Sequence, residues 1–267
     1  MQDAGDWLKE HGRRVIRIAS GGEGDPDEGL EATVIAANAI SLLLKVRTGN
    51  RVVAVKVFDP ANRSSSEGFQ RELGVIEALA GTGLVPGLKG YSVADAFLVM
   101  PWIEGVTLGH ALVEAGVPDA AFELGRWFGQ FERHMPREVY ETTWGDYLGA
   151  YAEPGIGSVI DSHGPFLRRL PIAERRIAKN DAFLGNFLKP ENGTIIGIDF
   201  EAAALKPPGW DLLLTGRYLA RLAPSRIGDI ADNLVRGYAN PAGLVESEDL
   251  NALIRVFCLH TAIGRGP

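Results

Sequence analysis

Three residues with oxygen-bearing side chains stand close together in the second half of the sequence. Asp181 is followed after four intervening residues by Asn186, and Asp199 lies in the segment of residues 198–201. Carboxylate and amide oxygens are the hard ligands that Mg²⁺ prefers, and a further carboxylate can accept a hydroxyl proton. We therefore expect a magnesium-dependent phosphoryl-transfer centre, in which Asp181 orients or deprotonates a hydroxyl while Asn186 and Asp199 hold the metal.

The residues between these groups predict a β-hairpin. Residues 190–193 read Pro-Glu-Asn-Gly, which is typical of a turn, and residues 194–198 are rich in isoleucine, as strands often are. Such a hairpin would bring Asn186 beside Asp199. Each polar residue also has a structural interpretation, because Asp and Asn are favoured in turns and at helix caps.

A lysine within an apolar strand is the next candidate group. Lys56 interrupts the apolar residues 52–58, and a buried amine needs a charged partner or water. Glu72 is the natural partner, because its spacing directs it towards the buried face of an amphipathic helix. The alternative is that both side chains are simply exposed to solvent.

The elements that must position these groups change in character near residue 101. Interruptions at residues 38–39 and 48–50 divide the β-branched stretch 33–58 into three expected strands. Residues 64–80 predict one packed helix that opens with capping-box spacing, and residues 96–100 predict another strand. Further helices are expected at residues 107–115, 119–134, 144–152, 211–222, 227–238 and 248–261.

These elements predict an α+β protein of two lobes. A small antiparallel β-sheet with one packed helix occupies residues 1–100 in this prediction and forms one lobe. Residues 101–105 join it to a larger, mainly helical lobe at residues 106–267, which contains the candidate phosphoryl-transfer residues Asp181 and Asn186.

Composition narrows the function classes. The chain has 267 residues, 46% of them apolar, which is enough for a substantial core. Lys and Arg number 27 against 34 Asp and Glu, a net charge of −7 without any basic run, so we expect no nucleic-acid partner. Cys258 is the single cysteine, which excludes an intrachain disulfide and a multi-cysteine zinc cluster.

The sequence also carries no targeting signal that we recognise. Its first residues lack the basic start and apolar core of a signal peptide, and no uncharged run is long enough for a membrane span. We therefore expect a cytoplasmic protein without a membrane partner, and the sequence indicates no oligomeric state. Residues 20–29 are rich in glycine, but their four carboxylates would repel phosphate, so we interpret them as a surface loop.

Together these residues resemble the protein-kinase-like fold, and more closely its aminoglycoside phosphotransferase and choline kinase branch, over roughly residues 33–218. Lys56 with Glu72 resembles that family's strand lysine and helix glutamate. Residues 99–105, Val-Met-Pro-Trp-Ile-Glu-Gly, resemble its hinge, residues 181–186 its catalytic loop, and residues 198–201 its metal-binding segment.

The resemblance implies the cofactors ATP and Mg²⁺ and transfer of the γ-phosphate to a hydroxyl of a small molecule that is aminoglycoside-, choline- or sugar-like. It makes residues 1–100 the nucleotide-binding lobe, residues 101–105 the hinge and residues 106–267 the lobe with the catalytic loop and the acceptor site. Adenine would bond to hinge backbone, where Pro101 can offer only its carbonyl. Asp211 would either brace the catalytic loop or cap a helix, and both interpretations stay open. The implied nucleotide-binding residues are Lys56, Glu72, Asn38 at the tip of the nucleotide loop, Met100, Pro101, Trp102 and Ile103.

Three departures from the family pattern support an alternative function. Lys179-Asn180 replaces the usual His-Gly before the catalytic aspartate, and Phe183 stands where small-molecule kinases have histidine and protein kinases lysine. The expected nucleotide loop, residues 34–40, contains no glycine. The alternative is a catalytically weak or inactive pseudokinase that binds nucleotide or acts as a scaffold. A protein-serine kinase fits less well, because it would need a lysine at position 183.

Overall fold

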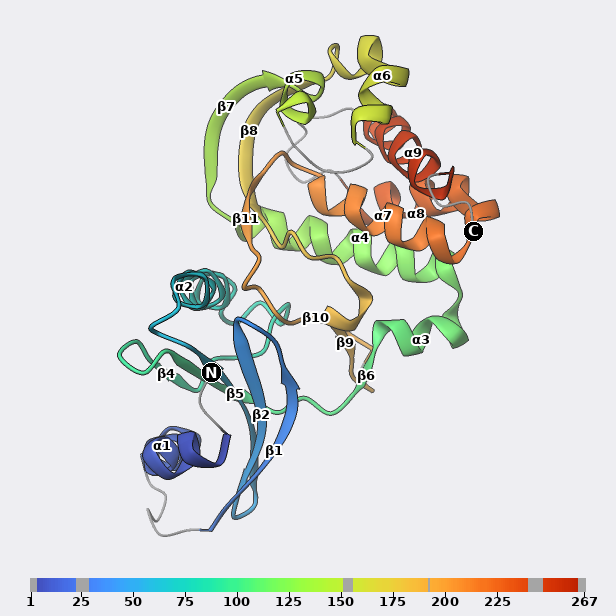
Figure 1. Cartoon of the computed structure of the whole chain (residues 1–267). Coiled ribbons are helices and arrows are strands. Elements are labelled where there is room, and N and C mark those ends of the chain that lie inside the picture. Colours follow the sequence, from blue (N-terminus) through green and yellow to red (C-terminus); the bar gives the residue numbers. More distant parts are fainter. Residues whose placement is uncertain (1–3, 23–28, 151–155, 192, 240–246, 264–267) are drawn as a thin grey trace. The chain divides into compact units, whose positions relative to one another are not determined.

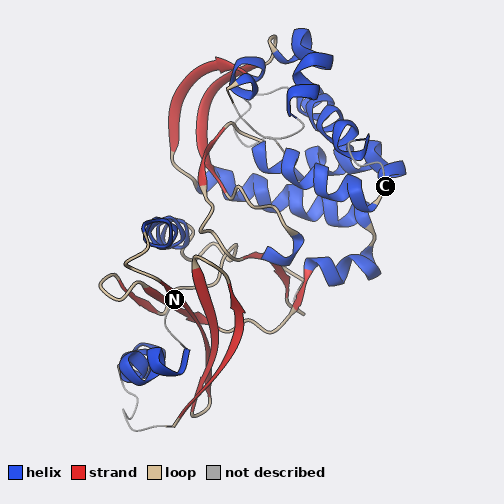
Figure 2. Cartoon of the chain, in the orientation of Figure 1, coloured by secondary structure: helices blue, strands red, loops and turns tan. Residues whose placement is uncertain are grey.

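The computed structural model describes residues 4–22, 29–150, 156–191, 193–239 and 247–263 (Figure 1). The chain forms two compact units. The first contains Met1–Gly105 and Ile196–Ala202, and the second contains Val106–Ile195 and Ala203–Pro267. Figure 2 shows the strands of the first unit and the predominance of helices in the second.

The first unit is built on an antiparallel sheet of five strands in the order β1-β2-β3-β5-β4. The three strands expected within residues 33–58 are present as a meander. The elements of this unit are α1 (Ala4–Ala19), β1 (Leu30–Ala37), β2 (Ser41–Thr48), β3 (Arg51–Phe58), α2 (Arg63–Ala78), β4 (Gly90–Ser92), β5 (Phe97–Pro101) and β10 (Ile196–Gly197).

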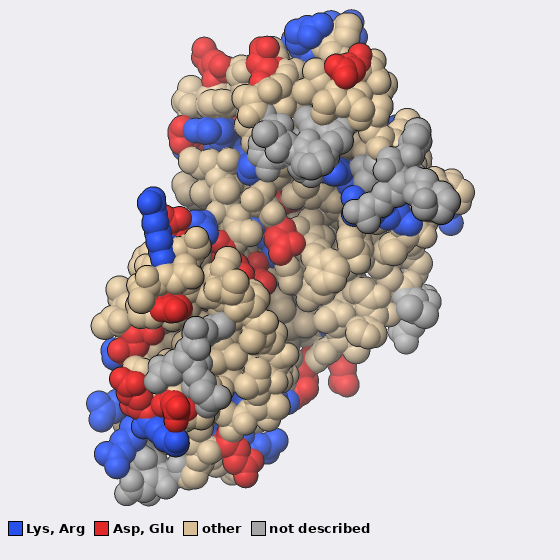
Figure 3. Space-filling model, viewed as in Figure 1, with Lys and Arg blue, Asp and Glu red and all other residues tan. Residues whose placement is uncertain are grey.

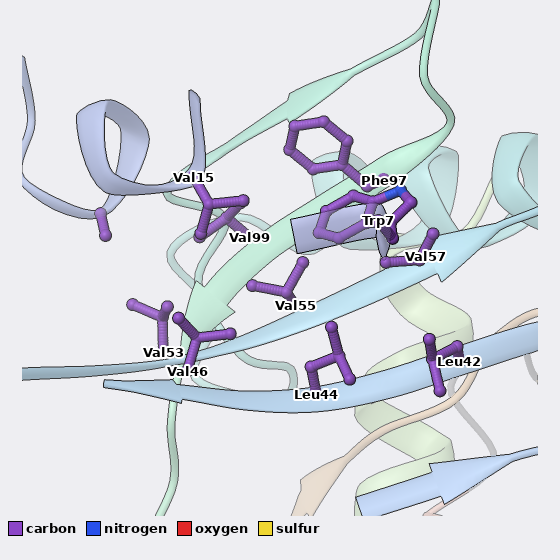
Figure 4. Close-up of a cluster of buried hydrophobic side chains, with 11 residues drawn as sticks. Trp7, Val15, Leu42, Leu44, Val46, Val53, Val55, Val57, Phe97 and Val99 are labelled. Carbon is purple, nitrogen blue, oxygen red and sulfur yellow. The ribbon is translucent and has the colours of Figure 1, made fainter. Parts of the chain in front are cut away.

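Alternation along β3 decides which side chains reach the core and which reach the candidate site. Val53, Val55 and Val57 are buried in a cluster with Trp7 and other residues of α1. Figure 4 shows these side chains together, with Trp7 edge-on to Phe97 at a centroid distance of 5.3 Å. Because successive residues of a strand point to opposite faces, Lys56 lies on the other face of the sheet.

The helix α1 was not expected from the sequence. It is amphipathic, and its buried residues include Trp7, Val15 and Ala19. The residues that follow it, 23–28, lie outside the described part of the chain, and so does most of the loop expected at residues 20–29.

The helix α2 starts differently from the capping box expected at residues 64–67. Its N-cap is Asn62, whose side chain accepts a hydrogen bond from the Ser65 amide at 3.3 Å. The buried Ser65 hydroxyl donates instead to the carbonyl of Ile40. That hydroxyl therefore ties the helix to the loop between β1 and β2, which a local pattern does not reveal.

The second unit packs its helices around α4 and α8. Gly125 and Gly129 allow this contact, because a Cβ at either position would lie 2.2 Å from a carbonyl oxygen of α8. The helices are α3 (Leu108–Ala115), α4 (Val117–His134), α5 (Trp144–Gly149), α6 (Ile156–Leu167), α7 (Trp210–Leu222), α8 (Ile227–Tyr238) and α9 (Ser247–Ile263), with 3₁₀ turns η1 (Leu184–Asn186) and η2 (Pro224–Arg226).

Strands in this unit position the candidate catalytic loop. β7 (Arg137–Thr143), β8 (Pro171–Ala178) and β11 (Ala204–Lys206) form a sheet in the order β11-β8-β7. β6 (Val106–Thr107) pairs antiparallel with β9 (Phe187–Lys189). The candidate loop therefore runs from the end of β8 to the start of β9.

The turn expected after β9 is partly described. The Gly193 amide donates to the Pro190 carbonyl at 2.9 Å, while Asn192 lies outside the described residues. Among the described helices, none has the length and apolar character needed to cross a membrane. On the face drawn in Figure 3, acidic and basic side chains are interspersed.

Candidate active site

Lys56 is the centre of a buried ion-pair cluster in the first unit. Its Nζ lies 2.5 Å from Glu72, 2.7 Å from Asp199 and 3.1 Å from Glu201. The pairing of Lys56 with Glu72 is the one expected from the sequence, and the exposed alternative is wrong, since both residues are buried. The strand, the helix α2 and the segment around Asp199 thus meet at one amine.

The charges in this cluster perturb one another strongly. Burial alone would lower the pKa of Lys56, but the three carboxylates outweigh it and raise that pKa above its ordinary value. Burial raises the pKa of Glu72, while the Lys56 charge opposes that rise. The lysine is therefore a permanent cation, and its charge favours the ionised form of the adjacent glutamate.

Glu201 is a member of this cluster that the sequence did not predict. One of its carboxylate oxygens accepts from the Ser41 hydroxyl at 2.8 Å, and the other accepts from the Asn38 amide at 3.2 Å. Arg71 donates to the Glu201 carbonyl at 2.6 Å. Because these partners lie about 130 to 163 positions away in sequence, no local pattern could have found them.

Asn38 occupies the turn between β1 and β2, where the nucleotide loop was expected. Its side-chain oxygen accepts hydrogen bonds from the amides of Ile40 and Ser41, both at 2.7 Å. Asparagine can close a turn in this way without glycine. The glycine-free sequence of this loop is therefore compatible with a tight turn.

Three carboxylates of the cluster lie close enough together to hold a cation, and the Lys56 ammonium pairs with all three. Carboxylate oxygens of Glu72, Asp199 and Glu201 all lie within 4.8 Å of one another. Asp199 has a positive φ of 63°, a conformation that is uncommon outside glycine and occurs more often in aspartate and asparagine. The expected metal ligand Asp199 is thus in an oxygen-rich environment within the first unit.

The expected hinge residues are continuous with the sheet. Met100 is buried, and Pro101, Trp102 and Ile103 are half-buried. The Trp102 amide donates to the Val52 carbonyl at 3.3 Å, and Pro101 has no amide hydrogen. Of these positions, Ile103 therefore offers the backbone donor that is not used by the sheet.

The candidate catalytic loop brings Asp181 and Asn186 together in the second unit. The Asn186 side-chain amide donates to one Asp181 oxygen at 2.8 Å, and the Phe183 amide donates to the other at 3.3 Å. The 3₁₀ turn η1 places Asn186 one turn beyond the aspartate. This hydrogen bond directs the Asn186 amide nitrogen at Asp181, so its oxygen is the atom available to a metal.

Asp211 hydrogen-bonds to this loop and does not cap the helix. Of the two interpretations of that residue, the structure supports the brace. Its carboxylate accepts from the amides of Lys179 and Asn180, both at 2.8 Å, and the helix N-cap is Gly209. Burial raises the pKa of Asp211 to about 6. Asn180 adopts a φ of 60°, and its side-chain oxygen accepts from the Trp210 indole at 3.0 Å.

Two residues of this loop that depart from the family pattern, Lys179 and Phe183, lie in different surroundings. Lys179 is completely buried, with its Nζ 5.7 Å from the centre of the Phe187 ring, and it does not line the cavity beside Asp181. Phe183 is 52% exposed and lines that cavity. Two cations that were not singled out from the sequence, Arg217 and Arg221, also line it.

Comparison with known proteins identifies the fold. No protein-family model matches the sequence, and no curated protein matches it. Among solved structures, the ethanolamine kinase of Plasmodium vivax has a TM-score of 0.62 at 12% identity, covering 98% of this chain and 81% of that chain. The choline kinase LicA of Streptococcus pneumoniae has a TM-score of 0.56 at 15% identity, covering 96% and 100%.

The chain has the protein-kinase-like fold. A thermostable mutant of aminoglycoside phosphotransferase APH(4)-Ia, in a ternary complex with AMP-PNP and hygromycin B, is also similar. It has a TM-score of 0.52 at 18% identity and covers 89% of this chain and 95% of that one. The expected fold, that of the choline kinases and aminoglycoside phosphotransferases, is thereby confirmed.

Proposed function

We propose that this protein is an ATP- and magnesium-dependent phosphotransferase that moves the γ-phosphate of ATP to a hydroxyl of a small molecule. The observation that most strongly supports this proposal is the ion-pair cluster of Lys56 with Glu72 and Asp199. Burying this set of charges is costly, and a hydrophobic group would serve the fold as well. Such a cluster is therefore better explained by a function than by stability.

Each part of the site has a role in this proposal. Lys56, oriented by Glu72, positions the nucleotide phosphates, and Asp181 orients or deprotonates the acceptor hydroxyl. Asp199 and Asn186 would hold Mg²⁺, which supplies charge neutralisation at the phosphates when it is bound. Residues 101–105 would be the hinge that receives adenine, with Ile103 as the backbone donor.

A nucleotide-binding protein without efficient transfer is the second candidate. Two observations favour it: Phe183 places an aromatic ring where related enzymes have a cation, and Glu201 engages both Lys56 and Asn38. In this candidate the Glu201 carboxylate competes with phosphate for Lys56. Binding and turnover measurements separate the two candidates.

The test is a calorimetric titration of the protein with ATP, with and without Mg²⁺. The Asp199→Asn variant should lose the magnesium-dependent part of the affinity. The matched control is Asp6→Asn, which alters an exposed carboxylate on α1 that pairs with Lys9. Equal ATP affinity with and without Mg²⁺ in the natural protein would contradict the proposal.

Turnover is then measured as ADP release in the presence of candidate acceptors. The Asp181→Asn variant should bind ATP as the natural protein does, yet lose about 10²- to 10⁴-fold in transfer rate. Magnesium-dependent ATP binding together with no Asp181-dependent product would support the second candidate instead.

A further inference from the structure

A cavity of about 250 Å³ lies beside Asp181, entirely within the second unit. One wall is the candidate catalytic loop, including Asp181 and Phe183, and the other is α7. The volume is below the roughly 300–1,000 Å³ of pockets that enclose drug-sized ligands. The cavity therefore suits a small acceptor, or one small part of a larger molecule.

The wall from α7 is a single helical face. Leu214, Arg217, Tyr218 and Arg221 line the cavity, and their spacing of three, one and three residues puts them on one side of the helix. Asp211, in the first turn of α7, holds the two amides that precede Asp181. The loop and this helical face are thus joined by buried hydrogen bonds.

The charge of this wall is positive. Among the described residues that line the cavity, Asp181 is the acidic one, and Arg217 and Arg221 are both guanidinium cations. Arg217 is half-buried and Arg221 is exposed. Guanidinium groups bind carboxylate and phosphate through paired hydrogen bonds.

The two arginines follow Asp211, which is hydrogen-bonded to the loop, along α7. Arg217 and Arg221 follow Asp211 by six and ten residues, which corresponds to about 9 and 15 Å along the helix axis. In the lining of the cavity, the Phe183 ring of the loop and the Tyr218 ring of α7 meet edge-on at 5.6 Å. A ligand could therefore place a hydroxyl at Asp181, an apolar segment on the rings and an anion at the arginines.

We propose that the acceptor is a small hydroxylated anion, whose carboxylate or phosphate is bound by Arg217 and Arg221. This inference rests on the proposed phosphotransferase function and names its substrate class, which differs from the aminoglycoside-, choline- or sugar-like acceptors that the resemblance implies. The acceptor hydroxyl oxygen forms a bond to the γ-phosphorus and its proton passes to Asp181. The bond between that phosphorus and the β–γ bridging oxygen breaks, and ADP leaves.

Direct binding of four related probes tests the charge preference without requiring turnover. Glycerate and glycerol 3-phosphate carry an anion, glycerol is neutral and choline is cationic, and each has a hydroxyl. Calorimetry or ligand-observed NMR should show at least about tenfold tighter binding of one anionic probe, since a charge-assisted contact is worth that much. Comparing the two anionic probes distinguishes a carboxylate from a phosphate acceptor.

Variants locate the binding to the cavity. Arg221→Gln should weaken the preferred anion about tenfold or more, and Arg221→Lys should restore part of the loss. The control is Arg226→Gln, which removes the same charge from an exposed residue paired with Asp229 outside the cavity lining. An equal loss in the control would reveal a non-specific charge effect and overturn the inference.

The outcomes separate this inference from the proposed function. Magnesium-dependent ATP binding with tighter binding of glycerol or choline would overturn the anionic class and leave the phosphotransferase proposal standing. Absence of binding by either anion at concentrations up to about 10 mM would also overturn it, because that limit lies beyond even weak specific affinity. If the protein bound the anion at Arg221 but did not bind ATP, the phosphotransferase proposal would be contradicted and the anion site would stand.

Discussion

Replacing Lys56 with methionine tests the ion-pair cluster that underlies the account. Lys56 and Glu72 are 6% and 2% exposed, so the substitution leaves a buried carboxylate without its cation. Removing one member of a buried pair typically costs about 3–5 kcal/mol of unfolding free energy. Methionine fills a similar volume, so little of that loss would come from a cavity.

The loss of unfolding free energy should increase with pH. Burial already raises the pKa of Glu72, and Lys56 is the largest opposing influence. Without the lysine this pKa rises further above its unfolded value, so the folded variant binds the extra proton. The unfolding free energy of the variant therefore falls as pH increases from the unfolded pKa of Glu72 to its folded pKa. The loss of unfolding free energy relative to the natural protein should be greater at pH 8 than at pH 5.

Urea unfolding at the two pH values measures this effect. Lys45→Met is the matched control, because Lys45 lies on the neighbouring strand β2 and pairs at 3.1 Å with Glu104, whose side chain is 80% exposed. An exposed pair contributes about 1 kcal/mol or less. Equal losses for the two variants at pH 8, or a loss at Lys56 that does not change with pH, would refute the reasoning.

Three further predictions concern the packing of glycines, the buried Glu132 and the hydrogen bonds of Asp211. Gly129→Ala should cost about 1–3 kcal/mol in a denaturant titration, because its Cβ would lie 2.2 Å from the Tyr238 carbonyl, whereas Gly74→Ala meets no atom within 4 Å and should stabilise slightly. Burial raises the pKa of Glu132 to about 7, so unfolding free energy should fall by about 3 kcal/mol from pH 4.5 to 7, and Glu132→Gln should remove that slope. Asp211→Asn keeps one acceptor oxygen of two, and hydrogen exchange of the two amides it binds should accelerate at least about tenfold; unchanged exchange would argue against the brace.

Local patterns were sufficient for the parts of the site that lie on regular elements. Strand alternation turns Lys56 away from the valine-rich face of β3, and helical spacing turns Glu72 inward. The expected strands and most of the expected helices follow from the same two periodicities. These rules made Glu72 the natural partner of Lys56, and the exposed alternative was excluded only when both residues were found buried.

Contacts across long sequence separations were beyond such patterns. The position of Glu201 depends on Ser41 and Asn38, and no period links these residues. Asp211 looked equally suitable as a helix cap until its hydrogen bonds to the loop were seen. The cationic face of α7 was accessible in principle, because its helical spacing could have been examined next to the candidate loop.

The central proposal is that Asp199 and Asn186 hold the same magnesium ion, as the sequence predicts. A double-mutant cycle with Asp199→Asn and Asn186→Ala, read as the magnesium-dependent ATP affinity by calorimetry, tests it most directly. If both side chains hold the same ion, each single variant loses at least about tenfold and the double variant loses little more than the worse single one. Additive losses, or magnesium-dependent affinity that survives in both single variants, would contradict the claim.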